Sequence, residues 1–270
     1  MRRGAATGRG GAEVIGDEPR LVDSALEAAA DPDRASARRD DGSAPGQVAR
    51  PRIIVIDDST QTRDTFALAF PEIDVAAAFS SVDGALSQHL SADLVVLDLH
   101  LDHTPHSLDL QGPRAVRALT QAGYRVCVYT DEWRLLILAQ CFSAGAAGLL
   151  RKSDPLAMNE AALLTVAAGG TAVPASMAEL AHLLMRRQRL PQLTTRQTEV
   201  LTARARGQSY EAIAARLNIT VKVARQHYQA VMPKLLLFLQ EARLDPQASA
   251  GDVELALGLG PGDLNDPWSL

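Results

Sequence analysis

Two apolar stretches that end in aspartate decide the fold of this chain: Ile53-Ile54-Val55-Ile56 before Asp57-Asp58, and Leu94-Val95-Val96-Leu97 before Asp98. Residues 126–129 before Thr130 and residues 147–151 before Lys152 repeat the pattern. Apolar runs of this length are typical of buried strands in a parallel sheet, and helix-like stretches lie between them. The sequence therefore predicts an α/β fold with a doubly wound parallel sheet.

The polar residues at these strand ends are predicted to form one site, because ligands bind where the carboxyl ends of parallel strands meet. Carboxylates of this kind are suitable oxygen ligands for Mg²⁺. A carboxylate beside such an ion can attack phosphorus, while the Thr130 hydroxyl and the Lys152 ammonium can stabilise phosphoryl oxygens. The sequence thus predicts a site that accepts a phosphoryl group on Asp98.

The order of these residues along the chain resembles that of a two-component receiver domain over about residues 51–170. The resemblance implies a five-stranded sheet, Mg²⁺ as cofactor and a sensor histidine kinase as partner. In such a domain Asp98 would be phosphorylated, and Thr130 and Lys152 would sense the phosphoryl group. The metal ligands it implies are Asp57, Asp58, Asp98 and the backbone carbonyl of His100.

Two features differ from the usual receiver pattern. The loop of residues 100–112 is long and lacks the Met-Pro pair that receivers carry after the phosphorylated aspartate. Leu149 stands where receivers usually have an aromatic switch residue, so the phosphorylation site follows the receiver pattern but the aromatic part of its readout does not. His100, His103 and His106 in the loop could bind a transition metal, but a solvated polar loop is favoured because Pro105 prevents a continuous helix.

Charge is unevenly distributed along the 270 residues, whose formal net charge is −5. Residues 186–240 carry ten basic and two acidic side chains, whereas no basic residue follows Arg243. This asymmetry indicates a nucleic-acid face followed by an acidic tail. Cys127 and Cys141 are expected to pack in the core, and with no membrane-spanning stretch or export signal the chain is expected in the cytoplasm.

Composition and turn residues predict five segments. Residues 1–50 are expected to be a disordered extension, because they contain few large apolar side chains. The receiver is expected over 51–170, a linker helix over 171–191, a helix-turn-helix domain over 192–243 and an acidic flexible tail over 244–270.

The segment 193–235 is predicted to form three short helices. Thr194 or Thr195 can cap the first, Ser209 the second and Thr220 the third, and Gly207 ends the first. A tight turn at 218–220 between the last two helices is typical of a helix-turn-helix. Pro233 is expected to kink or end the third helix.

The third helix, its N-cap and the end of the second helix together carry six candidate DNA contacts. Arginine can bind guanine and glutamine can bind adenine, so three of the six are expected to contact bases. The expected base contacts are Arg225, Gln226 and Gln229, and the expected phosphate contacts are Lys222, Arg216 and the Thr220 hydroxyl. The segment is similar to the LuxR-like helix-turn-helix of NarL/FixJ-type response regulators, through residues that include Glu199-Val200-Leu201, Gly207 and Ile213-Ala214.

The resemblance implies a response regulator, not an enzyme, whose phosphorylation on Asp98 controls DNA binding and transcription and which acts as a homodimer. One alternative is an atypical regulator that acts through DNA or protein binding without phosphate, which Leu149 and the long loop support. A second is an Mg²⁺-dependent phosphatase with an aspartyl nucleophile. In that family the nucleophile precedes the acidic pair, and an aspartate stands where this chain has His100.

Overall fold

The computed structural model describes residues 49–101 and 110–264. These residues belong to the unit Ala49–Leu270, one of the two units into which the chain divides. The predicted disordered extension therefore lies almost wholly outside the described residues, as do His103 and His106 of the proposed metal loop.

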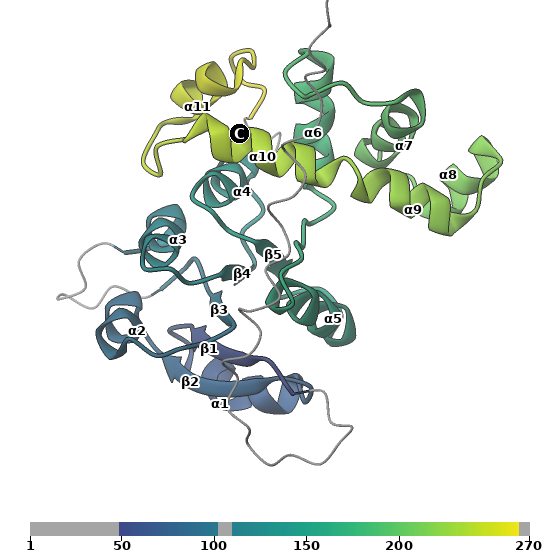
Figure 1. The fold of residues 1–270 in the computed structure, drawn as a ribbon. Helices are drawn as coiled ribbons and strands as arrows, with labels where there is room; N and C mark the ends of the chain where they lie inside the picture. Colours follow the sequence, from purple (N-terminus) through teal and green to yellow (C-terminus); the bar gives the residue numbers. More distant parts are fainter. Residues whose placement is uncertain (1–48, 102–109, 265–270) are drawn as a thin grey trace, which may run out of the picture. The chain divides into compact units, whose positions relative to one another are not determined.

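The first half of the unit contains a five-stranded parallel sheet in the order β2-β1-β3-β4-β5 (Figure 1). Its strands are β1 (Arg52–Ile56), β2 (Asp74–Phe79), β3 (Leu94–Leu97), β4 (Val126–Thr130) and β5 (Gly148–Arg151). They alternate with α1 (Thr60–Ala69), α2 (Val82–Gln88), α3 (Gly112–Gln121), α4 (Leu135–Ser143) and α5 (Leu156–Ala167). The predicted doubly wound α/β fold is confirmed.

Both faces of the sheet are buried. Successive residues of a strand point to opposite sides, so each strand contributes side chains to two cores. Ile53 and Val55 of β1 pack in one core with Phe66 of α1 and Leu163 of α5. The residues between and beyond them, such as Ile54, enter a second core with α2, α3 and α4. A strand that faces two apolar layers needs a continuous apolar run, which is the pattern that the sequence shows.

Six further helices follow the sheet. They are α6 (Met177–Arg186), α7 (Thr195–Ala205), α8 (Tyr210–Leu217), α9 (Val221–Gln229), α10 (Met232–Ala242) and α11 (Ala250–Leu257). The predicted caps are present: the side chains of Thr194, Ser209 and Thr220 accept hydrogen bonds from backbone N–H groups in the first turns of α7, α8 and α9. Gly207, with φ of 74°, follows α7. An all-helical second part is therefore confirmed.

The expected effect of Pro233 is also observed. Helix α9 ends at Gln229 and α10 begins at Met232, with the proline in the first turn of α10, where its missing N–H has no intrahelical partner to lose.

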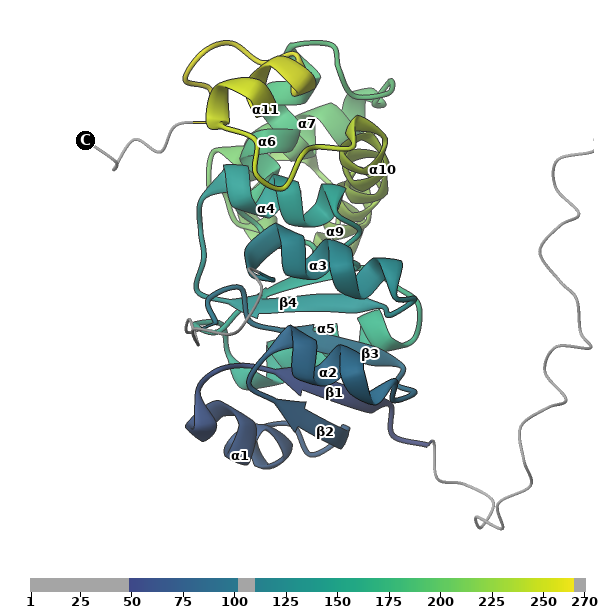
Figure 2. The same ribbon diagram turned by 90° about the vertical axis from the view of Figure 1, so that its left-hand side faces the viewer.

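The prediction of a flexible acidic tail is wrong for residues 244–264. The side chains of Leu244, Val253, Leu257 and Leu264 are buried, and α11 lies beside α10 in both views (Figures 1 and 2). The Gln140 amide of α4 donates hydrogen bonds to the carbonyls of Asp245 and Ala248, at 2.9 and 3.2 Å. The prediction rested on charge and overlooked these apolar residues, of which Val253 and Leu257 lie four positions apart on one side of α11.

The boundaries predicted inside the unit remain a prediction. Helix α6 falls within the proposed linker, where it buries Met177, Leu180 and Leu184 and contacts α7. Within the described ranges no helix combines the length and apolar character needed to cross a lipid bilayer.

Candidate phosphoryl-acceptor site

The centre of the site is an ammonium group between two carboxylates. Lys152 follows β5, and its Nζ donates hydrogen bonds to Asp57 Oδ2 and Asp98 Oδ2, each at 2.8 Å. Asp57 and Asp98 are only 2% and 6% exposed. Burial opposes the charge on Lys152, yet its hydrogen bonds to the two carboxylates raise its pKa above the ordinary value. The strand ends of β1, β3 and β5 therefore converge on one charged cluster, as the sheet topology requires.

A third carboxylate completes an oxygen-rich group. One oxygen each from Asp57, Asp58 and Asp98 lie within 4.8 Å of one another. The turn that carries the first two is fixed, because Arg63 Nη1 donates to the carbonyls of Asp57 and Asp58 and the Ser59 N–H donates to Asp57 Oδ1. Hard oxygen donors at this spacing fit a divalent cation such as Mg²⁺.

Thr130 and His100 lie at the same edge of the sheet. Thr130 ends β4 and is fully buried; its carbonyl accepts a hydrogen bond from the Lys152 N–H at 3.2 Å. Its hydroxyl accepts one from the Glu132 N–H, also at 3.2 Å. The His100 N–H donates to Asp98 Oδ1 at 3.3 Å. The structure thus brings together the strand ends on which the sequence placed the site, while the individual roles stay predictions.

Glu132 is a feature of the site that the sequence analysis missed. Its buried carboxylate accepts hydrogen bonds from the backbone N–H groups of Trp133 and Arg134, both at 2.9 Å, and from the Arg134 guanidinium. The His100 Nε2 lies 3.6 Å from Glu132 Oε2. Although burial opposes the charge, these donors hold the pKa of Glu132 below its ordinary value. No sequence pattern indicates that a glutamate will accept hydrogen bonds from the backbone of the loop in which it lies.

An aromatic residue close to the predicted sensing lysine was also missed by the sequence analysis. Leu149, at the usual position of the switch residue, is buried in β5 opposite Val128. Tyr129 of β4 has its ring centroid 5.9 Å from Lys152 Nζ and packs edge-on against Phe66 and Phe70. A tyrosine inside an apolar strand run gave no reason to assign it to the site.

The candidate DNA contacts lie mainly on one side of α9. Ala224 and Tyr228 are buried, whereas the side with the four polar candidates is exposed. These four are Lys222, Arg225, Gln226 and Gln229, with Arg216 on α8 and Thr220 at the N-cap also exposed. Arg225 is not fully extended into solvent, because its guanidinium lies 5.3 Å from the centroid of the Tyr210 ring.

Comparison with known proteins gives three findings. Residues 191–237 match the family described as bacterial regulatory proteins of the luxR family. The chain is 30% identical to the response regulator RamR of Streptomyces coelicolor over 167 residues, 60% of this chain and 77% of RamR. It is 26% identical to the glycerol metabolism activator of Pseudomonas putida over 220 residues, 75% of this chain and 96% of that protein.

Among solved structures, the chain is similar to the response regulator RcsB of Salmonella typhimurium. That comparison has 18% sequence identity and a TM-score of 0.45, and it covers 72% of this chain and 98% of RcsB.

Proposed function

The chain belongs to the NarL/FixJ-type response regulators that control transcription, and from that premise we propose that phosphorylation of Asp98 regulates its binding to DNA. The observation that carries the proposal is the position of Lys152, whose ammonium bridges Asp57 and Asp98. An aspartate held beside a cation and two further carboxylates is suited to accept a phosphoryl group.

The proposed cofactor is Mg²⁺, held by Asp57, Asp58, Asp98 and the backbone carbonyl of His100. The spacing of the three carboxylates supports this proposal. When bound, the ion would neutralise charge on the phosphoryl oxygens.

In the proposed reaction a carboxylate oxygen of Asp98 forms a bond to phosphorus, and the donor group leaves with the electrons of its own bond to phosphorus. The donor is the phosphohistidine of a sensor kinase or a small acyl phosphate. Lys152 would exchange its contact with the Asp98 carboxylate for one with a phosphoryl oxygen, and the Thr130 hydroxyl would donate to another. The lysine already lies at the required edge of the sheet.

The proposed output is DNA binding by α9 in the cytoplasm, through Arg225, Gln226 and Gln229 on bases and Lys222, Arg216 and Thr220 on phosphates. In the structure Arg225 and Gln229 line a cleft whose other lining residues include Met158 and Asn159 of α5. A DNA duplex and α5 would compete for this side of α9. We therefore propose that phosphorylation releases α9 and that the active form is a homodimer.

The first experiment measures intact mass after incubation with Mg²⁺ and acetyl phosphate. We expect one added phosphoryl group in the wild type and none in Asp98→Ala. Asp131→Ala is the matched control, because Asp131 is an exposed carboxylate one residue after Thr130 and holds none of the proposed roles. An adduct that persists in Asp98→Ala, or that requires Asp131, contradicts Asp98 as the acceptor.

A second candidate function is regulation without phosphate, which the burial of Leu149 at the switch position supports. The two functions differ when the chain is loaded with beryllofluoride and Mg²⁺, a mimic of the phosphoryl group. A phosphorylation-controlled regulator changes its oligomeric state or DNA affinity. If loading is verified and neither changes, the second function is correct.

A further inference from the structure

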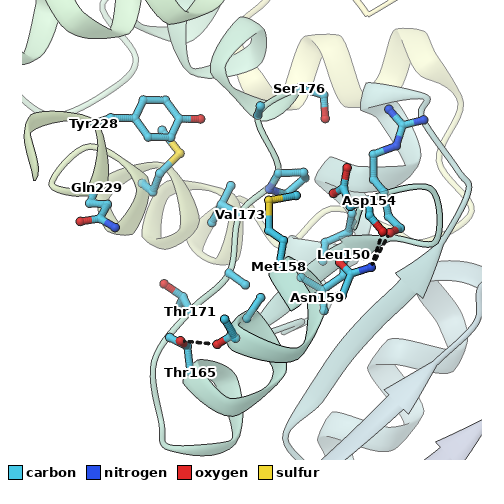
Figure 3. Close-up of a pocket in the computed structure, with 18 of the residues that line it drawn as sticks. Leu150, Asp154, Met158, Asn159, Thr165, Thr171, Val173, Ser176, Tyr228 and Gln229 are labelled. Atoms are coloured by element: carbon cyan, nitrogen blue, oxygen red, sulfur yellow. Dashed lines mark hydrogen bonds between the residues drawn. The ribbon is translucent and has the colours of Figure 1, made fainter. Parts of the chain in front are cut away.

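A cleft of about 880 Å³ lies beside the end of β5 and helix α5 (Figure 3). One wall consists of the end of β5, helix α5 and the segment 171–176 that follows it. The facing wall includes Tyr228 and Gln229 of α9 together with Arg204, Tyr210 and Arg225. None of Asp57, Asp98 or Lys152 lines it, so it is distinct from the site described above.

Three buried polar atoms in the described part of the chain have no hydrogen-bond partner, and all three belong to residues of this cleft. They are Arg151 Nε, Arg204 Nε and the Tyr228 hydroxyl. Buried polar groups are normally paired, so such a group calls for an explanation. Each of these atoms has almost no exposed surface, so a guest in the cleft can supply the missing acceptor when the adjoining side chains of the wall shift to admit it.

Two of the three atoms belong to a compact cluster. The Arg204 guanidinium lies 4.6 Å from the Tyr210 ring centroid and 6.0 Å from that of Tyr228, and Arg225 lies 5.3 Å from the Tyr210 ring. Arg204 is held in place because its Nη1 donates to the Gln208 carbonyl at 2.5 Å. Within residues 49–101 and 110–264, its Nε has no acceptor. The cluster therefore presents fixed donors and positive charge.

Tyr228 is suited to act as a donor here. It is only 6% exposed, and in Figure 3 its hydroxyl points from α9 toward the segment that carries Val173 and Ser176. Burial raises its pKa well above the ordinary value, so the hydroxyl keeps its proton. A protonated hydroxyl without a partner can donate to an oxygen of a guest.

The charge and polarity of the lining define the guest. Arg151, Arg204 and Arg225 line the cleft, against one carboxylate, Asp154. On the α5 wall Asn159 donates to the carbonyls of Arg151 and Asp154, and Thr165 donates to that of Ala161, so these polar groups already have partners (Figure 3).

The same wall carries apolar side chains, among them Met158, which is 53% exposed, and Val173. One side of the cleft thus suits an anionic head and the other a hydrocarbon body.

We propose that this cleft binds an amphipathic organic anion, a monocarboxylate with a short hydrocarbon or aromatic body. Its carboxylate oxygens accept hydrogen bonds from Arg204 Nε and the Tyr228 hydroxyl, and its apolar body contacts Met158 and Val173. Binding neutralises part of the arginine charge and satisfies donors that the protein leaves unpaired. The site requires no phosphorylation and is independent of the function proposed for Asp98.

The test uses the unphosphorylated full chain with octanoate and 3-phenylpropanoate as probes, and octylamine as a probe of opposite charge. Isothermal titration calorimetry is expected to show saturable binding of at least one carboxylate with one site per chain, and none of octylamine. Tyr228→Phe and Arg204→Gln are each expected to weaken binding about tenfold or more, as for loss of a hydrogen bond to a charged group.

Two matched variants control for general damage. Tyr124→Phe removes a tyrosine hydroxyl outside the cleft that donates to the Leu90 carbonyl, and Arg206→Gln removes an exposed arginine near Arg204. Both are expected to bind the probe like the wild type.

If the Tyr228 hydroxyl only stabilised the fold, its removal would lower the Tm of the free protein. Because the hydroxyl has no partner among the residues that the structure describes, Tyr228→Phe is expected to keep or raise the Tm without ligand while it weakens binding. The proposal is overturned if neither carboxylate binds saturably up to millimolar concentration. It is also overturned if octylamine binds equally, or if Tyr228→Phe and Arg204→Gln bind like the controls.

Discussion

At the scale of single residues, Glu132 organises the loop between Thr130 and α4. Its carboxylate is buried and accepts from two backbone N–H groups and from Arg134, whose own side chain is half-exposed. Glu132→Gln is expected to lower the free energy of unfolding by about 1–3 kcal/mol, because charge-assisted hydrogen bonds to a buried group are lost. Urea unfolding at neutral pH measures this difference.

The pH dependence of the free energy of unfolding provides a second test of the role of Glu132. The pKa of Glu132 is lowered in the folded chain, so its contribution is present above the ordinary value near 4.5 and is lost as pH falls through the folded value. The loss caused by Glu132→Gln should therefore shrink toward acid pH. Glu199→Gln is the control, because Glu199 pairs with Arg196 on the surface and such a pair contributes about 0–1 kcal/mol. Equal losses in the two variants would contradict the assignment.

At the scale of elements, the sequence predicted best what local chemistry determines. The runs before Asp57 and Asp98 were typical of buried strands, and Thr194, Ser209 and Thr220 marked helix starts that the structure contains. The convergence of the strand ends followed from parallel topology alone. These features depend on residues that are neighbours in the chain or on a general rule of sheet geometry.

What the sequence did not predict depends on contacts between distant residues. Met158 and Tyr228 line the same cleft although they are far apart in the chain. Residues 244–264 are attached through a hydrogen bond from Gln140 to the Asp245 carbonyl. No pattern near any of these residues points to its partner. The loop capped by Glu132 is local, yet a glutamate beside an arginine in a turn is too common to indicate it.

The contact between α4 and the last segment supports an element-scale prediction. Gln140 is buried, and its amide is the donor to the carbonyls of Asp245 and Ala248. Gln140→Met keeps the size of the side chain but removes both hydrogen bonds, so the free energy of unfolding should fall by about 1–3 kcal/mol. Hydrogen exchange should become faster in α11.

The control for that experiment is Gln121→Met, at an exposed position at the end of α3. It should leave both stability and exchange unchanged. Protection of α11 that is the same in Gln140→Met as in the wild type would mean that apolar packing alone holds residues 244–264.

At the scale of the whole molecule, the cleft and the proposed DNA face share two residues. Arg225 and Gln229 line the cleft and are also candidate base contacts. An organic anion in the cleft and a DNA duplex on α9 would then compete for the same side chains. If both proposals hold, the chain responds to two inputs, phosphorylation at Asp98 and a small molecule at Tyr228, that act on α9 from different places.

This competition yields a quantitative prediction. Octanoate at saturation should weaken binding of a DNA duplex that the chain itself selects from a random library. Linkage requires that the same duplex weaken octanoate binding by the same factor. Fluorescence anisotropy and calorimetry measure the two factors, with ionic strength held constant because DNA affinity depends steeply on salt.

The variant Tyr228→Phe separates the two sites. Its hydroxyl is buried and is not among the candidate DNA contacts, so DNA binding without octanoate should match the wild type while the effect of octanoate is lost. Wild-type DNA affinity that does not change at verified octanoate saturation would show that the cleft and the DNA face act independently. Two equal factors well above one would instead show that an occupied cleft lowers the affinity of α9 for DNA, because only a ligand that prefers one arrangement of α9 can shift its equilibrium.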